Sequence, residues 1–391
     1  MNIKEEAQAL EPELIRLRRY FHQHAEQSWQ EFNTQKKIEE YLDGLGIPYE
    51  EPYKTAVIAT IRGKNSSDRL IGIRADIDAL PIQEKTACSF KSENDGTMHA
   101  CGHDTHISIL LAAAKLLSEH KDELKVSVRL IFQPAEEFIE DSGAYHLKTV
   151  PAVLECERLI GLHIFSSVPA GCASLQDGPI MASADTFDIY IKGIGAHGGH
   201  PENAIDPIQA GVEIVQSINR IVAREFNPLT PNVISITQFV SGTTSNVIPE
   251  TAHLAGTTRS ADPAVRDAFE ATLQRVCDAI ALDTKTEISL SYHWGCAVTI
   301  NDHEPAETGR RAAKKVFGED KLLHLPFSTG GEDFSKYTNP KAYLVLGGGL
   351  ADPAHQWPQH SPYYEIDESV LKLGVEYFCQ YIEEWTQELG L

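Results

Sequence analysis

The sequence predicts an α/β protein in which a largely parallel-sheet domain is interrupted by an inserted ferredoxin-like domain. In the first half of the chain, short and almost continuously apolar runs alternate with helical stretches, which is typical of strands buried on both faces of a parallel sheet. The middle of the chain instead follows the order β-α-β-β-α-β, which is the ferredoxin-like arrangement. We therefore expect one domain formed by residues 1–183 and 295–391 and an inserted domain at residues 184–294.

The first domain is expected to begin with amphipathic helices and to continue with buried strands. Helices are predicted at residues 4–24 and 34–44, the second ended by Gly44. The apolar runs that predict strands lie at residues 56–61, 69–74, 125–132, 158–164 and 342–346. A further helix is expected at residues 104–118. Because helical stretches separate several of these strands, we expect the strands to pair mainly in parallel.

The inserted domain shows a clearer alternation of apolar and polar residues. The stretch DTFDIYIKG (185–193) alternates in this way and predicts a half-exposed strand. Residues 205–223 predict a helix. Its apolar side chains are expected on one stripe, formed by Ile208, Val212, Val215 and Val222. The remaining elements are strands at 232–240, 250–259 and 286–293 and a helix near 262–281.

Composition and charge exclude several classes of partner and setting. The formal net charge is −22 with no basic stripe to offset it, so neither nucleic acid nor an anionic membrane is an expected partner. No apolar run approaches the ~18 residues of a membrane span, and MNIKEEAQALEPEL does not resemble a secretory signal. The seven cysteines never form a CxxC pair, so we expect most to be buried and unpaired. A cytoplasmic protein is the expectation.

The unusual polar residues follow predicted strands or precede a predicted helix. Asp76 and Asp78 come just after one strand, and Glu136 and Glu137 come just after another. The remaining members are His163, at the end of a third strand, and the segment TMHACGHDTH, which leads into the helix at 104–118. Because ligands of open α/β sheets gather beyond the carboxyl ends of the strands, these side chains are expected to share one cleft.

The residue types in this cleft favour a metal site. Cys101 and His103 approach from one tight loop, in which Gly102 lets the backbone turn. A thiolate, imidazoles and a carboxylate suit zinc, manganese, cobalt or nickel better than calcium or magnesium. Adjacent Glu136 and Glu137 then divide the work, one binding metal and the other taking a proton from water.

Two alternatives remain open from the residues alone. Glu136 and Glu137 could belong to a solvated acidic loop with no ligand. Cys101 could instead be a nucleophile activated by an imidazole, although no separate His–Asn or His–Asp pair stands out to orient the base.

Eight segments in order resemble those of a known enzyme family. They are RADIDALP, MHACGHDTH, QPAEE, GLHI, IKGIGAHGGHP, SNVIPE, TGGEDFS and QHSPYYEIDE. The chain resembles the aminoacylase and carboxypeptidase-like co-catalytic metallopeptidases. Within them it is similar to the branch of hippurate hydrolases, N-acetyl-diaminopimelate deacetylases and indole-acetyl-amino-acid amidohydrolases. The resemblance covers nearly the full length, and in this family the inserted domain is a lid and often a dimerisation surface.

The resemblance implies two divalent metal ions per chain, manganese, zinc, cobalt or nickel, and assigns roles to individual residues. The implied metal ligands are Cys101, His103, Glu137, His163 and His360, with Cys101 bridging the two metals. Glu136 is implied as the general base, and Asp78 as the residue that orients a histidine ligand. His106 is expected to pack behind the metal loop, and the roles of Asp76, Glu332 and Asp333 are left open.

The resemblance also assigns substrate contacts to the lid. His197 is implied to stabilise the oxyanion, often from the partner subunit, and Asn246 and Arg259 to hold the substrate. Arg259 suits a carboxylate. The implied activity is hydrolysis of N-acyl amino acids, with acetyl as the best candidate acyl group, by a metal-bound hydroxide in a homodimer. A dipeptidase or carboxypeptidase-like activity on short peptides, a Cys101 thiol hydrolase and a non-catalytic metal-binding relative are the alternatives.

Overall fold

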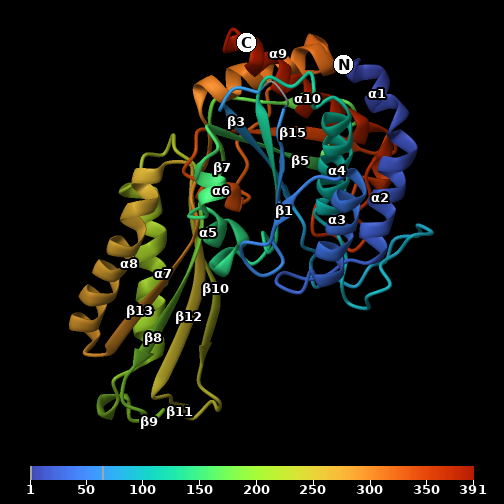
Figure 1. Cartoon of the computed structure of the whole chain (residues 1–391). Helices are drawn as coiled ribbons and strands as arrows, with labels where there is room; N and C mark the ends of the chain where they lie inside the picture. The colour runs from blue at the N-terminus through green and yellow to red at the C-terminus, as the bar shows by residue number, and fades with distance from the viewer. Residues whose placement is uncertain (1, 64–65) are drawn as a thin grey trace. The chain divides into compact units, whose positions relative to one another are not determined.

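The computed structural model describes residues 2–63 and 66–391, which divide into two compact units (Figure 1). The first unit contains the chain up to Gly178, Ile300–Pro326 and Lys336–Leu391, and the second contains Pro179–Thr299 and Phe327–Ser335. The short segment Phe327–Ser335 therefore groups with the second unit, outside the predicted bounds 184–294 of the inserted domain. No helix within the described ranges is long and apolar enough to cross a membrane.

The first unit begins with three helices rather than the two expected. They are α1 (Ile3–Ala9), α2 (Glu11–Gln23) and α3 (Phe32–Leu45). Leu10 separates α1 from α2, and Pro12 lies in the first turn of α2. Since proline has no backbone N–H to donate, it is tolerated at the start of a helix but not in its interior, so one continuous helix over 4–24 is disfavoured. The C-cap of α3 is Gly46, with φ +67°, rather than Gly44.

A seven-stranded sheet forms the centre of the first unit, in the order β1-β2-β4-β3-β5-β15-β6. Its strands are β1 (Tyr49–Glu50), β2 (Val57–Ile61), β3 (Leu70–Asp76), β4 (Ser127–Gln133), β5 (Arg158–Pro169), β6 (Ala173–Ser174) and β15 (Lys341–Gly349). The four central strands pair in parallel, and the three outer ones pair antiparallel. Every residue of β3 and β4 is buried, which explains their nearly continuous apolar sequences.

Helices of the first unit pack against this sheet and against one another. The longer ones are α4 (His103–Glu119), α9 (His303–Phe317) and α10 (Leu371–Glu388), and the short ones are α5 (Gly143–Leu147) and α6 (Pro151–Leu154). Helix α4 is almost wholly buried, because α2 and α10 pack against it and it also contacts β3. Its first turn is therefore held rigidly beside the carboxyl end of β3.

The second unit has the ferredoxin-like order of elements. These are β8 (Ala184–Lys192), α7 (Pro207–Arg224), β10 (Asn232–Ser241), β12 (Thr251–Ser260), α8 (Pro263–Thr284) and β13 (Glu287–Cys296). The four strands pair antiparallel in the order β10-β12-β8-β13, and a separate apolar core joins them to α7 and α8. The remaining strands, all short, are β7 (Gly178–Met181), β9 (Ala196–His197), β11 (Val247–Ile248) and β14 (Thr299–Asn301). The predicted fold class is confirmed.

The predicted apolar stripe of α7 is wrong. Val212 is 39% exposed, and Val215 and Val222 are only partly buried at the edge of the core. The buried face of the helix is formed by Ala210, Ile214, Ile218 and Ile221. Two interleaved sets of β-branched residues at helical spacing occur in this sequence, and contact with the sheet selects one of them.

Candidate metal centre

Cys101 and His103 are placed by the start of helix α4. Gly102 is the N-cap of this helix and has φ +99°, a conformation that glycine adopts without steric cost. A side chain at this position would also collide, because a Cβ would lie 2.5 Å from Cγ2 of Ile164 and 2.8 Å from the hydroxyl of Tyr364. The turn therefore requires glycine, and it presents Cys101 and His103 to the same side.

Asp78 fixes the orientation of His103. Nδ1 of His103 lies 2.9 Å from the backbone carbonyl of Asp78 and 3.3 Å from its Oδ1. A proton on Nδ1 is thus donated to Asp78, so Nε2 is the ring nitrogen that faces the cluster. Nε2 is buried and has no hydrogen-bond partner among the described residues. It lies 3.8–3.9 Å from carboxylate oxygens of Asp76, Glu136 and Glu137.

The segment after β4 delivers Glu136 and Glu137 through a backbone turn at Ala135. Ala135 has φ +51°, which costs a residue with a Cβ about 1 kcal/mol or more. Its N–H donates to Oε1 of Glu31 over 2.9 Å, and the hydroxyl of Thr55 donates to Oε2 of Glu31 over 2.7 Å. Glu31 is fully buried, so its carboxylate holds the turn in place from a distant part of the chain.

The position of Glu137 is fixed by a hydrogen bond that its backbone N–H donates. Its N–H donates to Oδ2 of Asp78 over 3.0 Å, and Ser28 donates to the same oxygen over 2.7 Å. The one carboxylate of Asp78 therefore fixes both the ring of His103 and the backbone of Glu137.

His163 and His360 approach from two other parts of the first unit. Nδ1 of His163, in β5, donates to the carbonyl of Ile164 over 2.7 Å, and its Nε2 lies 3.3 Å from Sγ of Cys101. His360 has φ +66° and is fixed by its N–H, which donates to the carbonyl of Ala100 over 2.8 Å. Its Nε2 lies 3.4 Å from Oε1 of Glu137.

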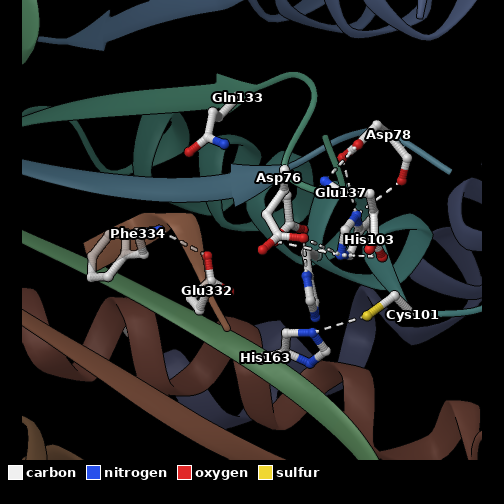
Figure 2. Close-up of polar contacts among 12 residues, drawn as sticks. Asp76, Asp78, Cys101, His103, Gln133, Glu137, His163, Glu332 and Phe334 are labelled. Atoms are coloured by element: carbon white, nitrogen blue, oxygen red, sulfur yellow. Dashed lines mark hydrogen bonds and ion pairs between the residues drawn. The ribbon is translucent and has the colours of Figure 1, made fainter. Parts of the chain in front are cut away.

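These residues converge on one place, where Figure 2 labels Cys101, His103, Glu137 and His163. Their potential ligand atoms form overlapping groups in which every atom lies within 4.8 Å of the others. The groups are Cys101–His103–His163, Cys101–Glu137–His360 and His103–Glu136–Glu137. Each shares a residue with the others, so five residues widely spaced in the sequence, together with Glu136, surround a volume suited to more than one cation.

The electrostatics of this cluster favour positive charge within it. Burial lowers the pKa of His103, but the carboxylates of Asp76 and Asp78 outweigh burial and raise it to about 10. Burial together with the charges of Glu137 and Glu136 raises the pKa of the Cys101 thiol well above its ordinary value. In the absence of a cation the cluster therefore retains protons on both side chains. A divalent cation would supply the same compensation.

Asp76 and His106 form a buried hydrogen-bonded pair next to this cluster. Oδ1 of Asp76 lies 2.5 Å from Nδ1 of His106, and Oδ2 accepts from Nη1 of Arg74 over 2.6 Å. The other ring nitrogen of His106 accepts from the N–H of Ile164 over 3.0 Å. Burial would raise the pKa of Asp76, but the charges of His103, His106 and Arg74 outweigh it and keep the pKa well below the ordinary value. His106 thus packs behind the loop, as expected.

The residues predicted to bind substrate from the inserted domain lie in the second unit, where they fall into two places. His197 is exposed on β9 and pairs with Val247 of β11, next to Asn246, whose carbonyl accepts from the N–H of Gly198 over 2.8 Å. Figure 1 shows β9 and β11 at one end of the long strands of this sheet. Arg259 lies towards the other end of β12, where its guanidinium donates to the carbonyl of Thr258 over 2.9 Å.

The structure does not bring His197 and Arg259 of one chain together. Thr251, at the start of β12, pairs with Lys192 at the end of β8, from which the chain continues to His197. At about 3.3 Å per strand residue, residues 251 to 259 span about 26 Å. Glu332, which the sequence analysis left unassigned, is buried in this unit and accepts from the N–H of Phe334 over 2.9 Å.

Residues 72–384 match the model of peptidase family M20/M25/M40. The chain belongs to this family. The match spans most of the sequence, and it confirms the resemblance noted from the motifs.

Curated relatives are similar over nearly the whole chain. The chain is 37% identical over 379 residues to an N-acetylcysteine deacetylase of Bacillus subtilis, covering 95% of this chain and 96% of that protein. It is 36% identical over 377 residues to thermostable carboxypeptidase 1 of Saccharolobus solfataricus, covering 95% of each. Both a deacetylase and a carboxypeptidase are therefore among its relatives in this hydrolase family.

Solved structures of the family share the fold. A putative aminohydrolase from methicillin-resistant Staphylococcus aureus superimposes with a TM-score of 0.91 at 30% identity, covering 97% of this chain and 98% of that one. A Bacillus subtilis protein described as a dinuclear metal-binding peptidase of the M20 family has a TM-score of 0.82 at 34% identity, covering 96% and 98%.

Proposed function

We propose that this protein is a metal-dependent amidohydrolase that cleaves the amide bond of N-acyl amino acids, with N-acetyl compounds as its preferred class. The observation that carries the proposal is the convergence of Cys101, His103, Glu137, His163 and His360 on one place, with Glu136 beside them. The family membership and the deacetylase among the relatives support the reaction class.

The residues present fit two divalent cations. The buried Nε2 of His103 has no hydrogen-bond partner among the described residues and faces three carboxylates, as a ligand atom awaiting a metal would. His103 and His163 each use Nδ1 on a carbonyl oxygen, which leaves Nε2 for a metal. Cys101 belongs to both the His163 and the His360 group, so its thiolate would help to hold both cations, and His103 and Glu137 are likewise shared between groups. The set of thiolate, imidazole and carboxylate suits manganese, zinc, cobalt or nickel.

Bound cations of this kind polarise an amide carbonyl and make water acidic enough to act as a nucleophile near neutral pH. The chain's own residues supply the rest of the reaction. Glu136 is 6% exposed and lies beside Glu137. We assign Glu136 to accept the proton of the attacking water and to return it to the leaving amine nitrogen.

We assign the lid residues to substrate binding from two chains. Arg259 suits the carboxylate of the amino-acid product, Asn246 hydrogen-bonds the substrate, and His197 stabilises the oxyanion. Because about 26 Å of strand separates the His197 end of β12 from Arg259, one small substrate cannot contact both residues of the same chain. We therefore propose a homodimer, formed through the second unit, in which His197 comes from the second copy.

The seven cysteines without disulfides suit a reducing, cytoplasmic setting. A dipeptidase or carboxypeptidase-like activity is the second candidate, because a carboxypeptidase is 36% identical to this chain. Both reactions would use the same centre, so they differ only in the acyl group that is accepted.

The test uses the full chain reconstituted with manganese or zinc. Its rate of hydrolysis is measured on N-acetyl amino acids, benzoyl-glycine and unblocked dipeptides. We expect kcat/KM to be highest for an N-acetyl amino acid, and Glu136→Gln to abolish turnover of every substrate. A preference for dipeptides would move the assignment to a peptidase. No turnover in the reconstituted dimer would contradict the proposal. Light scattering tests the dimer, and a fully active monomer would exclude a role for His197 of a second copy.

A further inference from the structure

A second group of potential ligands lies in the first unit, outside the centre described above. Nε2 of His22, at the end of α2, lies 3.3 Å from Oε1 of Glu84, and Sγ of Cys88 lies 3.5 Å from the same oxygen. All three atoms lie within 4.8 Å of one another. Glu84 and Cys88 belong to the long segment between β3 and α4 that ends in Cys101.

The separations in this group match those between the ligands of a tetrahedral zinc ion. With bonds of about 2.0–2.3 Å, two ligand atoms of such an ion lie roughly 3.3–3.7 Å apart. The two distances to Oε1 of Glu84 fall in this range. His22 and Glu84 are buried and Cys88 is partly exposed, so the side chains need no large movement to surround an ion.

The orientation of His22 suits a metal ligand. Nδ1 of His22 is 2.8 Å from Oδ2 of Asp104, so a proton on Nδ1 is held by that carboxylate and Nε2 is directed at Glu84. A carboxylate behind a histidine is the usual support of a metal-bound imidazole. Arg18 is also near, but its charge is compensated by Asp104 at 2.9 Å and Glu368 at 3.2 Å.

Several hydrogen-bond donors point at one oxygen of Glu84, and a bound metal would take the place of their protons. Nε2 of His22, the hydroxyl of Thr86 and the thiol of Cys88 all face Oε1 of Glu84. The second oxygen of Glu84 accepts from the N–H of Ser92 over 2.7 Å, which leaves Oε1 directed into the group. Zinc binding would require the Cys88 thiol to lose its proton and Nε2 of His22 to be unprotonated, and the charge of the ion would then compensate the thiolate and the Glu84 carboxylate.

An open position is also available. His22, Thr86 and Cys88 line a cavity of about 320 Å³, together with Phe90 and Tyr364. A fourth ligand, such as water, could therefore reach the ion from the cavity.

We propose that His22, Glu84 and Cys88 form a third metal site, selective for zinc, which links α2 to the segment leading to Cys101. This site is independent of the proposed amidohydrolase activity. Its thiolate and imidazole ligands would exclude magnesium and, following the general order of affinities, bind zinc more tightly than manganese.

Labelling of Cys88 with an aromatic disulfide reagent tests the proposal in the metal-free full chain. Cys88 is partly exposed and the six other cysteines are buried, so the native protein is expected to have one fast-reacting thiol, absent in Cys88→Ser. We expect saturating zinc to slow this reaction at least tenfold and magnesium to leave it unchanged. Glu84→Gln should abolish the protection, and Glu93→Gln, which changes an exposed carboxylate of the same segment, should retain it.

Elemental analysis after zinc reconstitution gives a measurement that does not depend on the buried Glu84. We expect one zinc fewer per chain in Cys88→Ser than in the unmodified protein and in Cys172→Ala. An unchanged labelling rate with saturating zinc, or equal zinc contents, would overturn this proposal. Either result would leave the proposed hydrolysis untouched, whereas protection of Cys88 in a protein without N-acyl turnover would reject the hydrolysis alone.

Discussion

Two clusters of histidine, cysteine and carboxylate side chains lie in the first unit, and their polar atoms are satisfied in different ways. Around His103, three carboxylates face one imidazole nitrogen at 3.8–3.9 Å with no hydrogen bond formed. Around His22, both ring nitrogens already contact carboxylates, at 2.8 Å and 3.3 Å. The first cluster is incomplete without a cation, whereas the second is satisfied by its own protons.

The first cluster therefore needs a cation to satisfy its polar atoms, whereas zinc at the second cluster would have to displace protons that already satisfy them. Burial lowers the pKa of both histidines, and neighbouring carboxylates raise it again. For His103 those carboxylates are Asp76, Asp78 and Glu137, whereas for His22 they are Asp104 and Glu84. We therefore expect removal of metal to affect the two clusters unequally.

The largest contrast in kcat is expected between two substitutions of glutamate by glutamine, one in each cluster. Glu136→Gln should lower kcat by about 10²–10⁴-fold, because an amide cannot accept the proton of water, while the manganese content stays at two per chain. Glu84→Gln should change kcat no more than severalfold. Steady-state kinetics on an N-acetyl amino acid compares them, and equal losses would show that the two clusters act as one.

Removal of metal should destabilise the protein through the first cluster. At a free metal concentration 100 times its Kd, binding contributes about 2.7 kcal/mol per site to the free energy of unfolding. We expect a lower melting temperature after chelation, restored by manganese, in the unmodified protein and in Cys88→Ser alike. A melting temperature that does not rise when manganese is added would contradict the claim that the first cluster needs a bound cation.

A smaller effect is expected from the support behind the catalytic turn. Glu31→Ala removes the acceptor of the Ala135 N–H and frees a turn held at φ +51°, so kcat should fall about 10–100-fold. Glu31→Gln keeps an acceptor oxygen and should recover most of the loss. Glu26→Ala is the matched control, because Glu26 accepts from the N–H groups of Asn33 and Thr34 at the start of α3 instead. A similar loss in both alanine variants would indicate general destabilisation.

The sequence carries much of the fold and the cluster around His103, for identifiable reasons. Strands β3 and β4 are buried on both faces, so their apolar runs stand out, and the polar residues that follow them lie at one edge of the sheet. The Cys101–Gly102–His103 turn is similarly local, since a glycine between two potential ligands is visible in the sequence.

Other features depend on contacts that no local pattern encodes. Glu31 acts on Ala135 across 104 residues, and nothing near Glu31 in the sequence distinguishes it from a surface glutamate. The group formed by His22, Glu84 and Cys88 arises only when α2 packs beside the segment after β3. The buried face of α7 was missed because the sheet, and not helical spacing, selects Ile214 over Val212.

The most direct test of the centre is the manganese content per chain after chelation and reconstitution, measured by elemental analysis. Manganese stands below zinc in the order of affinities, and Cys88→Ala removes the thiolate of the second group, so the manganese content of this variant counts the first cluster alone. We expect two manganese ions per chain in the unmodified protein and in Cys88→Ala, with a clear loss in Cys101→Ala and in Glu137→Ala. A content near zero, or one that is the same in Cys101→Ala as in the unmodified protein, would contradict the assignment of these residues to a two-metal centre.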